Sequence, residues 1–298
     1  MLQLNAEAST RVSTTAQPLL RGCPACSRLT EQARLYAIGN CTILRCATCG
    51  LGRTEAPAFE PERYYTGDYF TGQHADGYAD YGGAEAVLRR EFARTVEFIR
   101  ARRDGGRLLE VGCAFGFFLQ EAKPFFDVSG IELAADAAAH ARRSGLNVLT
   151  GVADEATLQR LGSFDVVVML DVIEHLPDPD GMLRLLSRHL EPGGIMVITT
   201  GDFGSLVARL AGRYWRLMTP PQHLWFFTGA SLSRMARSAD LDCEYLDHPW
   251  KIVPLSLVLF QLRRMLGLPQ RTRPGAGGIG LPLNLFDAMR VLLRKLPA

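Results

Sequence analysis

Long apolar runs are missing from this chain of 298 residues, although 47% of its residues are hydrophobic. No stretch reaches the roughly 18 consecutive apolar residues that a membrane-spanning helix requires. Residues 1–20 also lack the basic and then apolar order of a secretion signal, and their Ser, Thr and Ala content predicts a disordered tail. These absences favour a cytoplasmic protein, and the hydrophobic fraction is sufficient for a sizeable core.

A strong excess of charge of one sign is missing as well. The 33 basic and 31 acidic residues leave a formal net charge of +2. Such a balance creates no general attraction for nucleic acid, although five arginines make residues 21–53 mildly basic. A nucleic-acid partner is therefore not the first expectation.

Seven cysteines are present, and in a cytoplasmic chain they indicate metal ligands or core residues before disulfides. Four of them form two Cys-x-x-Cys pairs separated by about twenty residues, namely Cys23, Cys26, Cys46 and Cys49. Two such pairs suit a tetrahedral Zn²⁺ site. Four thiolates leave no open coordination position, so the expected role of the zinc is structural. We therefore predict a small zinc ribbon over residues 21–53.

A glycine turn between a strand and a helix gives the first sign of a ligand site. Residues 107–111 predict a short buried strand, Gly112 permits a tight turn, and Gly116 opens a helix. Such a turn presents backbone N–H groups at the positive end of the helix dipole. Glu110, at the end of the strand, can accept a hydrogen bond from a cationic group above the turn.

A second acid follows at a similar place. The predicted strand at 128–131 ends in Glu132. An acid about twenty residues after the glycine turn is well placed to hold two ribose hydroxyls. The spacing of the glycines is not that of the G-x-G-x-x-G dinucleotide fingerprint. Together the two signals indicate a nucleoside-containing ligand.

Strands and helices alternate along the rest of the chain. This order predicts a doubly wound α/β sheet, whose ligand crevice lies at the carboxyl ends of its strands. Glu110, Glu132 and Asp154 all fall at such ends. The last segment, 286–294, fits a helix or a strand by periodicity alone. The other expected elements are strands at 147–149, 164–170, 195–199 and 243–246, and helices at 84–102, 134–144, 180–190 and 228–239.

The motifs resemble a branch of the class I S-adenosylmethionine-dependent methyltransferases that carries an N-terminal zinc ribbon. They are the cysteine pairs, LLEVGCAFGFFL, IEL, FDVVVMLDVIEHLPDP, LEPGGIMVITT and PQHLWFFT. The resemblance runs from about residue 21 to the end of the chain, and it implies a Rossmann-like seven-stranded sheet with 286–294 as a strand. Ala114 and Phe115 depart from the family, where a small glycine-containing pair is commoner. The branch is associated with modification of sugars, polysaccharides and secondary metabolites.

The resemblance also implies how S-adenosylmethionine is held. Glu110, with backbone groups of the glycine turn and of Leu170, would hold the methionine moiety, and Glu132 the ribose. Asp154 would meet the adenine amino group, although capping of the following helix explains it equally well. The predicted cofactor-binding residues are Glu110, Gly112, Cys113, Gly116, Glu132, Leu133, Asp154 and Leu170.

The candidate catalytic residues are His223, His175 and Asp171. Related sugar C-methyltransferases use a histidine at the place of His223 as base. Here Gln222 replaces the Glu that raises the pKa of that histidine, so His223 is either a base or an anchor of its loop. A second interpretation treats D-x-x-E-H, which includes Glu174, and His223 as a metal site that activates a hydroxyl. It rests on similarity to small-RNA 2′-O-methyltransferases and ubiquinone O-methyltransferases.

The expected layout is a tail at 1–20, the zinc ribbon at 21–53, an aromatic linker or flap at 54–82 and a catalytic domain at 83–298. A helical insert is expected near 252–280, and its apolar run 252–268 either contacts a membrane surface or packs over the substrate site. The expected partner is a small-molecule acceptor, glycosyl or secondary metabolite, methylated at oxygen or carbon. The alternative is an RNA methyltransferase that grips its target with the ribbon. The sequence specifies no oligomeric state.

Overall fold

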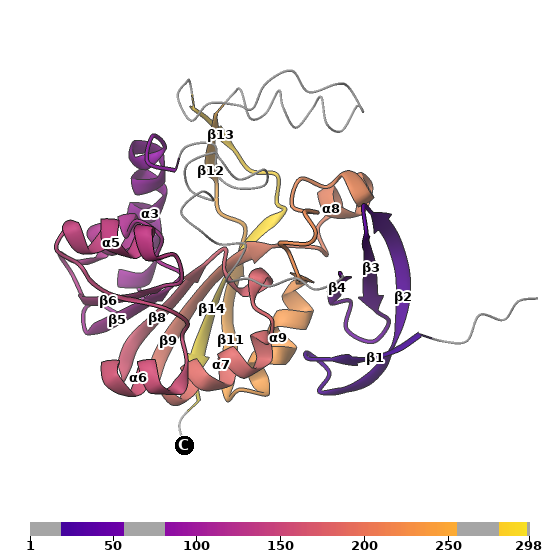
Figure 1. The fold of residues 1–298 in the computed structure, drawn as a ribbon, viewed down its shortest axis with the longest axis horizontal. Helices are drawn as coiled ribbons and strands as arrows, with labels where there is room; N and C mark the ends of the chain where they lie inside the picture. Colours follow the sequence, from indigo (N-terminus) through magenta and orange to yellow (C-terminus); the bar gives the residue numbers. More distant parts are fainter. Residues whose placement is uncertain (1–18, 57–80, 255–279, 297–298) are drawn as a thin grey trace, which may run out of the picture.

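The computed structural model describes residues 19–56, 81–254 and 280–296 (Figure 1). The expected tail lies almost wholly outside these residues, as do most of the predicted linker or flap at 54–82 and most of the predicted insert near 252–280. In the part of the chain that is described, no helix is both long enough and apolar enough to cross a lipid bilayer.

A mixed seven-stranded sheet lies at the centre of the domain predicted at 83–298. Its strands are β5 (Arg107–Val111), β6 (Asp127–Glu132), β7 (Asn147–Thr150), β8 (Phe164–Leu170), β9 (Leu190–Gly201), β11 (Leu241–Asp247) and β14 (Ala288–Lys295). They lie in the order β11-β14-β9-β8-β5-β6-β7. The strands from β9 to β7 run parallel, and β14 is antiparallel to both of its neighbours. The predicted Rossmann-like fold is therefore confirmed, including a strand in the last segment.

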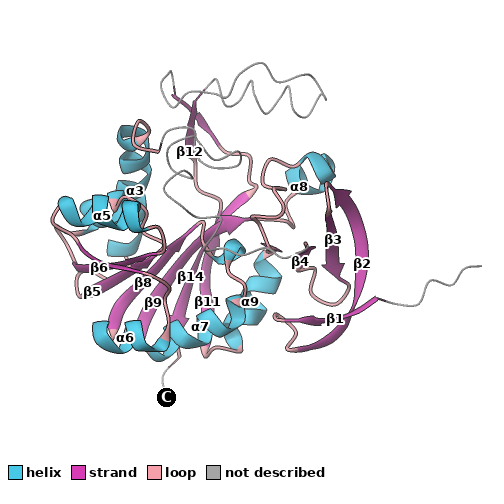
Figure 2. Ribbon diagram, viewed as in Figure 1, coloured by secondary structure: helices cyan, strands magenta, loops and turns pink. Residues whose placement is uncertain are grey.

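Helices cover both faces of this sheet (Figure 2), because successive side chains of a strand point to opposite faces. In β8, Val167 and Met169 pack with one helical layer, whereas Val166 and Val168 pack with the other. Burial on both faces explains why this strand is apolar at nearly every position. One layer consists of α3 (Glu85–Arg100), α4 (Phe117–Ala122) and α5 (Ala135–Arg143), and the other of α6 (Glu155–Leu161), α7 (Pro179–Arg188) and α9 (Gly229–Arg237).

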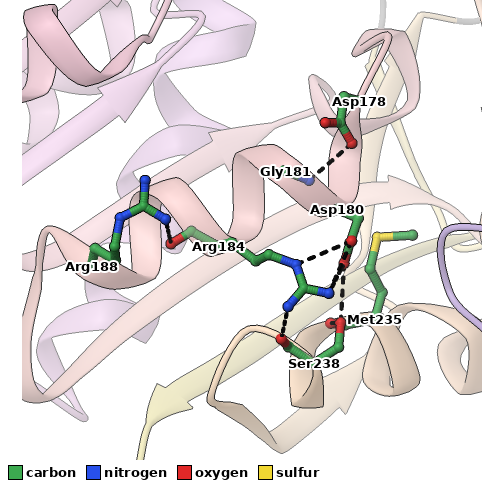
Figure 3. Close-up of polar contacts among 7 residues, drawn as sticks. All are labelled: Asp178, Asp180, Gly181, Arg184, Arg188, Met235 and Ser238. Atoms are coloured by element: carbon green, nitrogen blue, oxygen red, sulfur yellow. Dashed lines mark hydrogen bonds and ion pairs between the residues drawn. The ribbon is translucent and has the colours of Figure 1, made fainter. Parts of the chain in front are cut away.

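A polar network joins α7 to the end of α9 (Figure 3). Arg184 pairs with Asp180, four residues earlier in α7, at 3.1 Å, and donates a hydrogen bond to the carbonyl of Ser238. The Ser238 hydroxyl lies 3.0 Å from Asp180. Asp178 caps α7 by accepting from the N–H of Gly181 at 2.9 Å. Because α7 begins shortly after the turn that follows β8, the network fixes the helix next to the candidate site.

The N-terminal residues form a second, antiparallel sheet, and its last strand comes from a distant part of the chain. The strands are β1 (Leu19–Cys23), β2 (Arg28–Ile38), β3 (Cys41–Cys46), β4 (Gly52–Glu55) and β10 (Trp225–Phe226), in that spatial order. Arg53 pairs with Trp225 and Gly52 with Phe226. We call residues 19–55 the N-terminal module. The predicted ribbon boundary at residue 53 falls inside β4, and the module shares its sheet with β10, which belongs to the domain predicted at 83–298.

The module packs against the segment that follows β9. In Figure 1 it lies beside α8 (Leu206–Ala211). Ile43 of β3 and Phe226 of β10 belong to one buried cluster with Phe203 and Trp215. A Cβ atom at Gly52 would lie 2.9 Å from the side chains of Phe203 and Phe226. Only a glycine lets β4 approach this cluster so closely.

Candidate functional site

The turn after β5 depends on both predicted glycines. Gly112 and Gly116 have left-handed backbone torsions, with φ of 74° and 78°. A Cβ atom would lie 2.6 Å from Val172 at the first position and 2.4 Å from Leu146 at the second. Both the torsions and the lack of space exclude a side chain. The turn lies where β5 and β6 end side by side, at the carboxyl edge of the sheet.

Glu132 ends β6 and links this turn to the next helix. It is 6% exposed, and its two carboxylate oxygens accept hydrogen bonds from the N–H groups of Ala114 and Ala134, each at 2.8 Å. Burial raises the pKa of Glu132, while the backbone hydrogen bonds lower it. Carboxylate oxygens have further lone pairs, so the group can still accept from ribose hydroxyls. Ala114 has a left-handed φ of 46°, so the departure from the family pattern still permits the tight turn.

Glu110 is a buried acid at the end of β5. It is 3% exposed, and its Oε2 atom has no hydrogen-bond partner among the described residues. Burial, with the charge of Glu132 as a second cause, raises the pKa of Glu110 well above its usual value. A buried polar atom without a partner costs stability, and an ammonium group would supply that partner. The acids and glycines at this edge therefore fit the amino-acid and ribose parts of S-adenosylmethionine.

The remaining predicted cofactor residues differ in their surroundings. Asp154 is exposed and caps α6 by accepting from Thr157 N–H at 2.7 Å, and this hydrogen bond lowers the pKa of Asp154. Its contact with adenine stays a prediction. Cys113 is 3% exposed and packs in the core, which leaves its backbone for a ligand. Leu133 and Leu170 are half-buried at the ends of β6 and β8.

Glu174, His175 and His223 come together from two segments of the chain. The first two lie in a 3₁₀ turn (Ile173–His175) after β8, and His223 lies just before β10. One ligand atom of each side chain lies within 4.8 Å of the others. The imidazole rings have centroids 4.7 Å apart and planes at 73°. We call these three residues the histidine cluster. It contains three of the four residues that the metal interpretation names, and Asp171, the first acid of that motif, is not among them.

Backbone carbonyls orient both imidazole rings. Nδ1 of His175 lies 2.9 Å from the carbonyl of Gln222, and Nδ1 of His223 lies 2.8 Å from the carbonyl of Leu217. A carbonyl only accepts, so each neutral ring carries its proton on Nδ1 and a lone pair on Nε2. Burial lowers the pKa of both histidines, that of His223 to about 3 with His175 contributing. Both rings are therefore in the neutral form that binds metal ions.

Asp171 directly follows β8 and is not a member of the histidine cluster. It is exposed and has a left-handed φ of 54°. Its carboxylate accepts from the Thr199 hydroxyl at 2.9 Å, and its N–H contacts the carbonyl and the hydroxyl of Thr199 at 3.0 Å. Non-glycine residues with such torsions are uncommon, and they often occur at functional sites. Asp171 thus presents a carboxylate that Thr199 of β9 fixes at the carboxyl end of β8.

Sequence reasoning missed a hydrogen-bonded pair at the same edge. Nε2 of His248, which follows β11, lies 2.9 Å from Oδ2 of Asp202, which follows β9. Asn284 donates to the backbone carbonyl of His248 at 2.6 Å. The pair lies on the β9 side of β8, away from the glycine turn. No motif marks either residue, and the only signal in the sequence is that each follows a strand.

The four predicted metal-binding cysteines also meet. Sγ of Cys23 lies 3.5 Å from that of Cys49, Sγ of Cys26 lies 4.0 Å from that of Cys46, and all four lie within 4.8 Å. The Thr30 hydroxyl lies 3.2 Å from Sγ of Cys46. Hydrogen bonding to Cys49 lowers the pKa of Cys23 to about 5. Four free thiols at this separation have the donor set and spacing of a tetrahedral zinc site.

Comparison with known proteins adds the family. A family model described as a methyltransferase domain matches residues 84–246. A ubiquinone biosynthesis O-methyltransferase of Xanthomonas oryzae is 29% identical over 196 residues, which cover 59% of this chain and 82% of that protein. The protein of the same name from Methylococcus capsulatus is 31% identical over 186 residues, covering 57% and 78%.

The chain is also similar to solved structures. Magnesium protoporphyrin IX methyltransferase of Synechocystis, with bound S-adenosylhomocysteine, is 13% identical with a TM-score of 0.47, and the match covers 72% of this chain and 86% of that one. The YcgJ protein of Bacillus subtilis is 13% identical with a TM-score of 0.48, covering 70% and 100%. The family model matches more than half of the chain, and this protein therefore belongs to the class I S-adenosylmethionine-dependent methyltransferases.

Proposed function

We propose that this enzyme methylates a hydroxyl group of a small-molecule acceptor with the help of a divalent cation held by Glu174, His175 and His223. The observation that carries the proposal is the convergence of these side chains within 4.8 Å beside the end of β8. The names of the two relatives support a hydroxyl as the methylated group. The resemblance of the motifs supports a glycosyl or secondary-metabolite acceptor, and both kinds of acceptor offer hydroxyls.

The chain's task toward the cofactor is to bind and orient it. S-adenosylmethionine supplies a methyl group on a positively charged sulfur, and transfer in line requires close positioning of the reacting atoms. Glu110 would accept from its ammonium group and Glu132 from its ribose. Gly112 and Gly116 let the backbone approach it. The acceptor would then lie over β8 and β9, where the Asp202–His248 pair offers hydrogen bonds to its distal part.

The histidine cluster would hold the cation. Two imidazole nitrogens and a carboxylate oxygen suit several divalent cations. The carbonyls of Gln222 and Leu217 fix the two rings through Nδ1, which is the second contact that metal-binding histidines usually make. A bound cation lowers the pKa of a hydroxyl and so helps to remove its proton.

Chelation tests the proposal. Treatment with a chelator that leaves zinc on the cysteines should remove most of the methylation activity, and Mg²⁺ or Mn²⁺ should restore it. His175→Ala should show the same loss without rescue. His189→Ala is the matched control, because His189 lies between α7 and β9, beside Glu155 and outside the histidine cluster. The rate is measured as transfer of labelled methyl to phenolic, glycosyl and RNA acceptors in parallel.

A different outcome would favour the simpler chemistry. If the chelated enzyme keeps its full rate while His223→Ala loses it, His223 removes the proton itself and the cation is not needed. Against this stands the environment of His223, since burial lowers its pKa to about 3 and makes it a weak base. Labelling of RNA but not of small molecules would instead support the nucleic-acid alternative, with salt-sensitive binding through the module.

For the N-terminal module we propose a zinc ribbon in which Cys23, Cys26, Cys46 and Cys49 hold one structural Zn²⁺. Metal analysis of the purified protein should give about one zinc per chain, retained after mild chelation. Cys46→Ser should lose the zinc and melt at a lower temperature, because metal binding free energy contributes to folding. Cys41→Ser is the control, since Cys41 is not a member of the four-cysteine group. A wild-type protein that contains no zinc would contradict the proposal.

A further inference from the structure

The N-terminal module and the histidine cluster are joined through one short strand. In the module, β4 begins at Gly52, shortly after the second cysteine pair, and the N–H of Cys46 donates to the carbonyl of Leu51 at 2.9 Å. At its other side β4 pairs with β10, which contains only Trp225 and Phe226. A two-residue strand has little stability of its own, so its place depends on β4.

Thr54 makes the contact nearest to the cluster. Its hydroxyl donates to the carbonyl of His223 at 2.6 Å, and its N–H donates to the carbonyl of Leu224 at 2.9 Å. Thr54 is 8% exposed. From the other side, the N–H of Leu224 donates to the carbonyl of Glu174 at 2.9 Å. One peptide segment is thus held between the module and the turn that carries two members of the cluster.

Trp225 adds two contacts in the same place. Its indole N–H donates to the carbonyl of Leu176, directly after His175, at 2.9 Å. The guanidinium of Arg53, next to Thr54 in β4, lies 5.6 Å from the centre of the indole. The segment from His223 to Trp225 is therefore fixed by the module on one side and by the turn after β8 on the other.

We propose that the N-terminal module helps to position the histidine cluster, and that Thr54 is the residue of the module that positions His223. The inference rests on the proposed role of the histidine cluster. The hydroxyl of Thr54 fixes the carbonyl of His223, the carbonyl of Leu217 fixes its ring, and together they define where Nε2 points. Loss of the first contact lets the residue shift although every side chain of the cluster is still present.

Thr54→Val tests this assignment. Valine keeps the branched shape that suits a strand and removes only the hydroxyl donor. The turnover number should fall about 10- to 100-fold, the range found when the residues that orient metal ligands are changed, with the KM for S-adenosylmethionine unchanged. Thr54→Ser, which retains the donor, should recover most of the loss. Thr42→Val on β3, opposite Glu55, is the matched control and should behave as wild type.

Two further measurements do not depend on turnover. In ¹⁵N-histidine-labelled protein, the Nδ1–H signal of His223, assigned by its absence in His223→Gln, should broaden or shift in Thr54→Val and return in Thr54→Ser. Titration with Mn²⁺ should show about 10- to 100-fold weaker binding in Thr54→Val. Zinc content and melting temperature should stay near wild type, which separates positioning from loss of the module's fold.

The outcomes separate this inference from the proposed function. If wild-type protein binds Mn²⁺ at the cluster and Thr54→Val binds it equally well with an unchanged Nδ1–H signal, the positioning role is wrong. If wild-type protein binds no Mn²⁺ but the Nδ1–H signal of His223 still changes in Thr54→Val, Thr54 does position His223. The proposed cation site is then wrong. An equal loss in Thr42→Val would mean that the module responds to any change, and would overturn the assignment to Thr54.

Discussion

Glu110→Gln should melt at a higher temperature than wild type at pH 7 and yet bind S-adenosylhomocysteine about 100-fold more weakly. The wild-type carboxyl is 3% exposed, with one oxygen that has no partner in the described part of the chain. Glutamine removes the buried ionisable group, which relieves a cost in the free fold. It also removes the charge that would meet the cofactor's ammonium, and a hydrogen bond to a charged group contributes about 1.5–3 kcal/mol.

The difference in melting temperature between Glu110→Gln and wild type should depend on pH. Burial raises the pKa of Glu110 well above its usual value of 4.5, so the folded state holds this proton more tightly than the unfolded state. The contribution to stability is fully present below about pH 4.5 and is lost as the pH rises toward the raised pKa. Glutamine does not titrate. The gain in melting temperature should therefore be small below about pH 4.5 and should grow above it.

Calorimetry of unfolding and isothermal titration with S-adenosylhomocysteine measure the two halves of this expectation. Glu121→Gln is the control, because the Glu121 carboxylate lies 2.6 Å from Arg89 of α3 and Glu121 is not a predicted cofactor-binding residue. It should leave the affinity unchanged. A Glu110→Gln protein that binds like wild type would remove Glu110 from the cofactor site, whereas a lower melting temperature would show that its carboxyl has a partner within the fold.

The central sheet could be predicted because its pattern is local. The segment 164–170 was predicted as a strand and has the same ends in the structure, since an apolar run of this length suits a strand buried on both faces. For the last segment, 286–294, only the family resemblance favoured a strand over a helix. Val291 and Leu293 pack on one face and Leu292 on the other, so the pattern around them is not a clean alternation. The strand predicted at 195–199 is part of β9, which begins earlier, at Leu190. The Pro-Gly-Gly stretch near its start lies where the pairing with β8 is irregular.

The candidate site could be predicted only in part, for a physical reason. Strand ends indicated Glu110 and Glu132, because all parallel strands end at one edge. The pairing of Arg53 with Trp225 and the contact of Asp202 with His248 join segments far apart in the chain. No periodicity or local motif encodes such contacts, which depend on tertiary packing. The module therefore looked like a separate unit in the sequence, although the structure ties it to the histidine cluster.

Asp287→Ala should lower the free energy of unfolding by about 3–5 kcal/mol, as expected when one partner of a buried ion pair is removed. Asp287 is 2% exposed. Its carboxylate accepts from the indole N–H of Trp215 at 2.9 Å and from Nε and Nη2 of Arg216 at 2.8 and 2.9 Å. Alanine leaves the mostly buried guanidinium and the buried indole N–H without this acceptor.

The effect should extend to the histidine cluster, because the carbonyl that orients His223 belongs to Leu217, the residue after Arg216. Urea denaturation followed by fluorescence measures the stability, and the Nδ1–H signal of His223 reports the ring. Glu155→Ala, which breaks the exposed pair with Arg188, should change neither appreciably.

Replacing both partners, as in Arg216→Met with Asp287→Leu, should recover much of the stability, because no charge is then left buried alone. If the double variant is stable but the His223 signal stays altered, the buried pair serves to place Leu217 as well as to hold the fold. If Asp287→Ala unfolds like wild type, water reaches Arg216 and the pair contributes little.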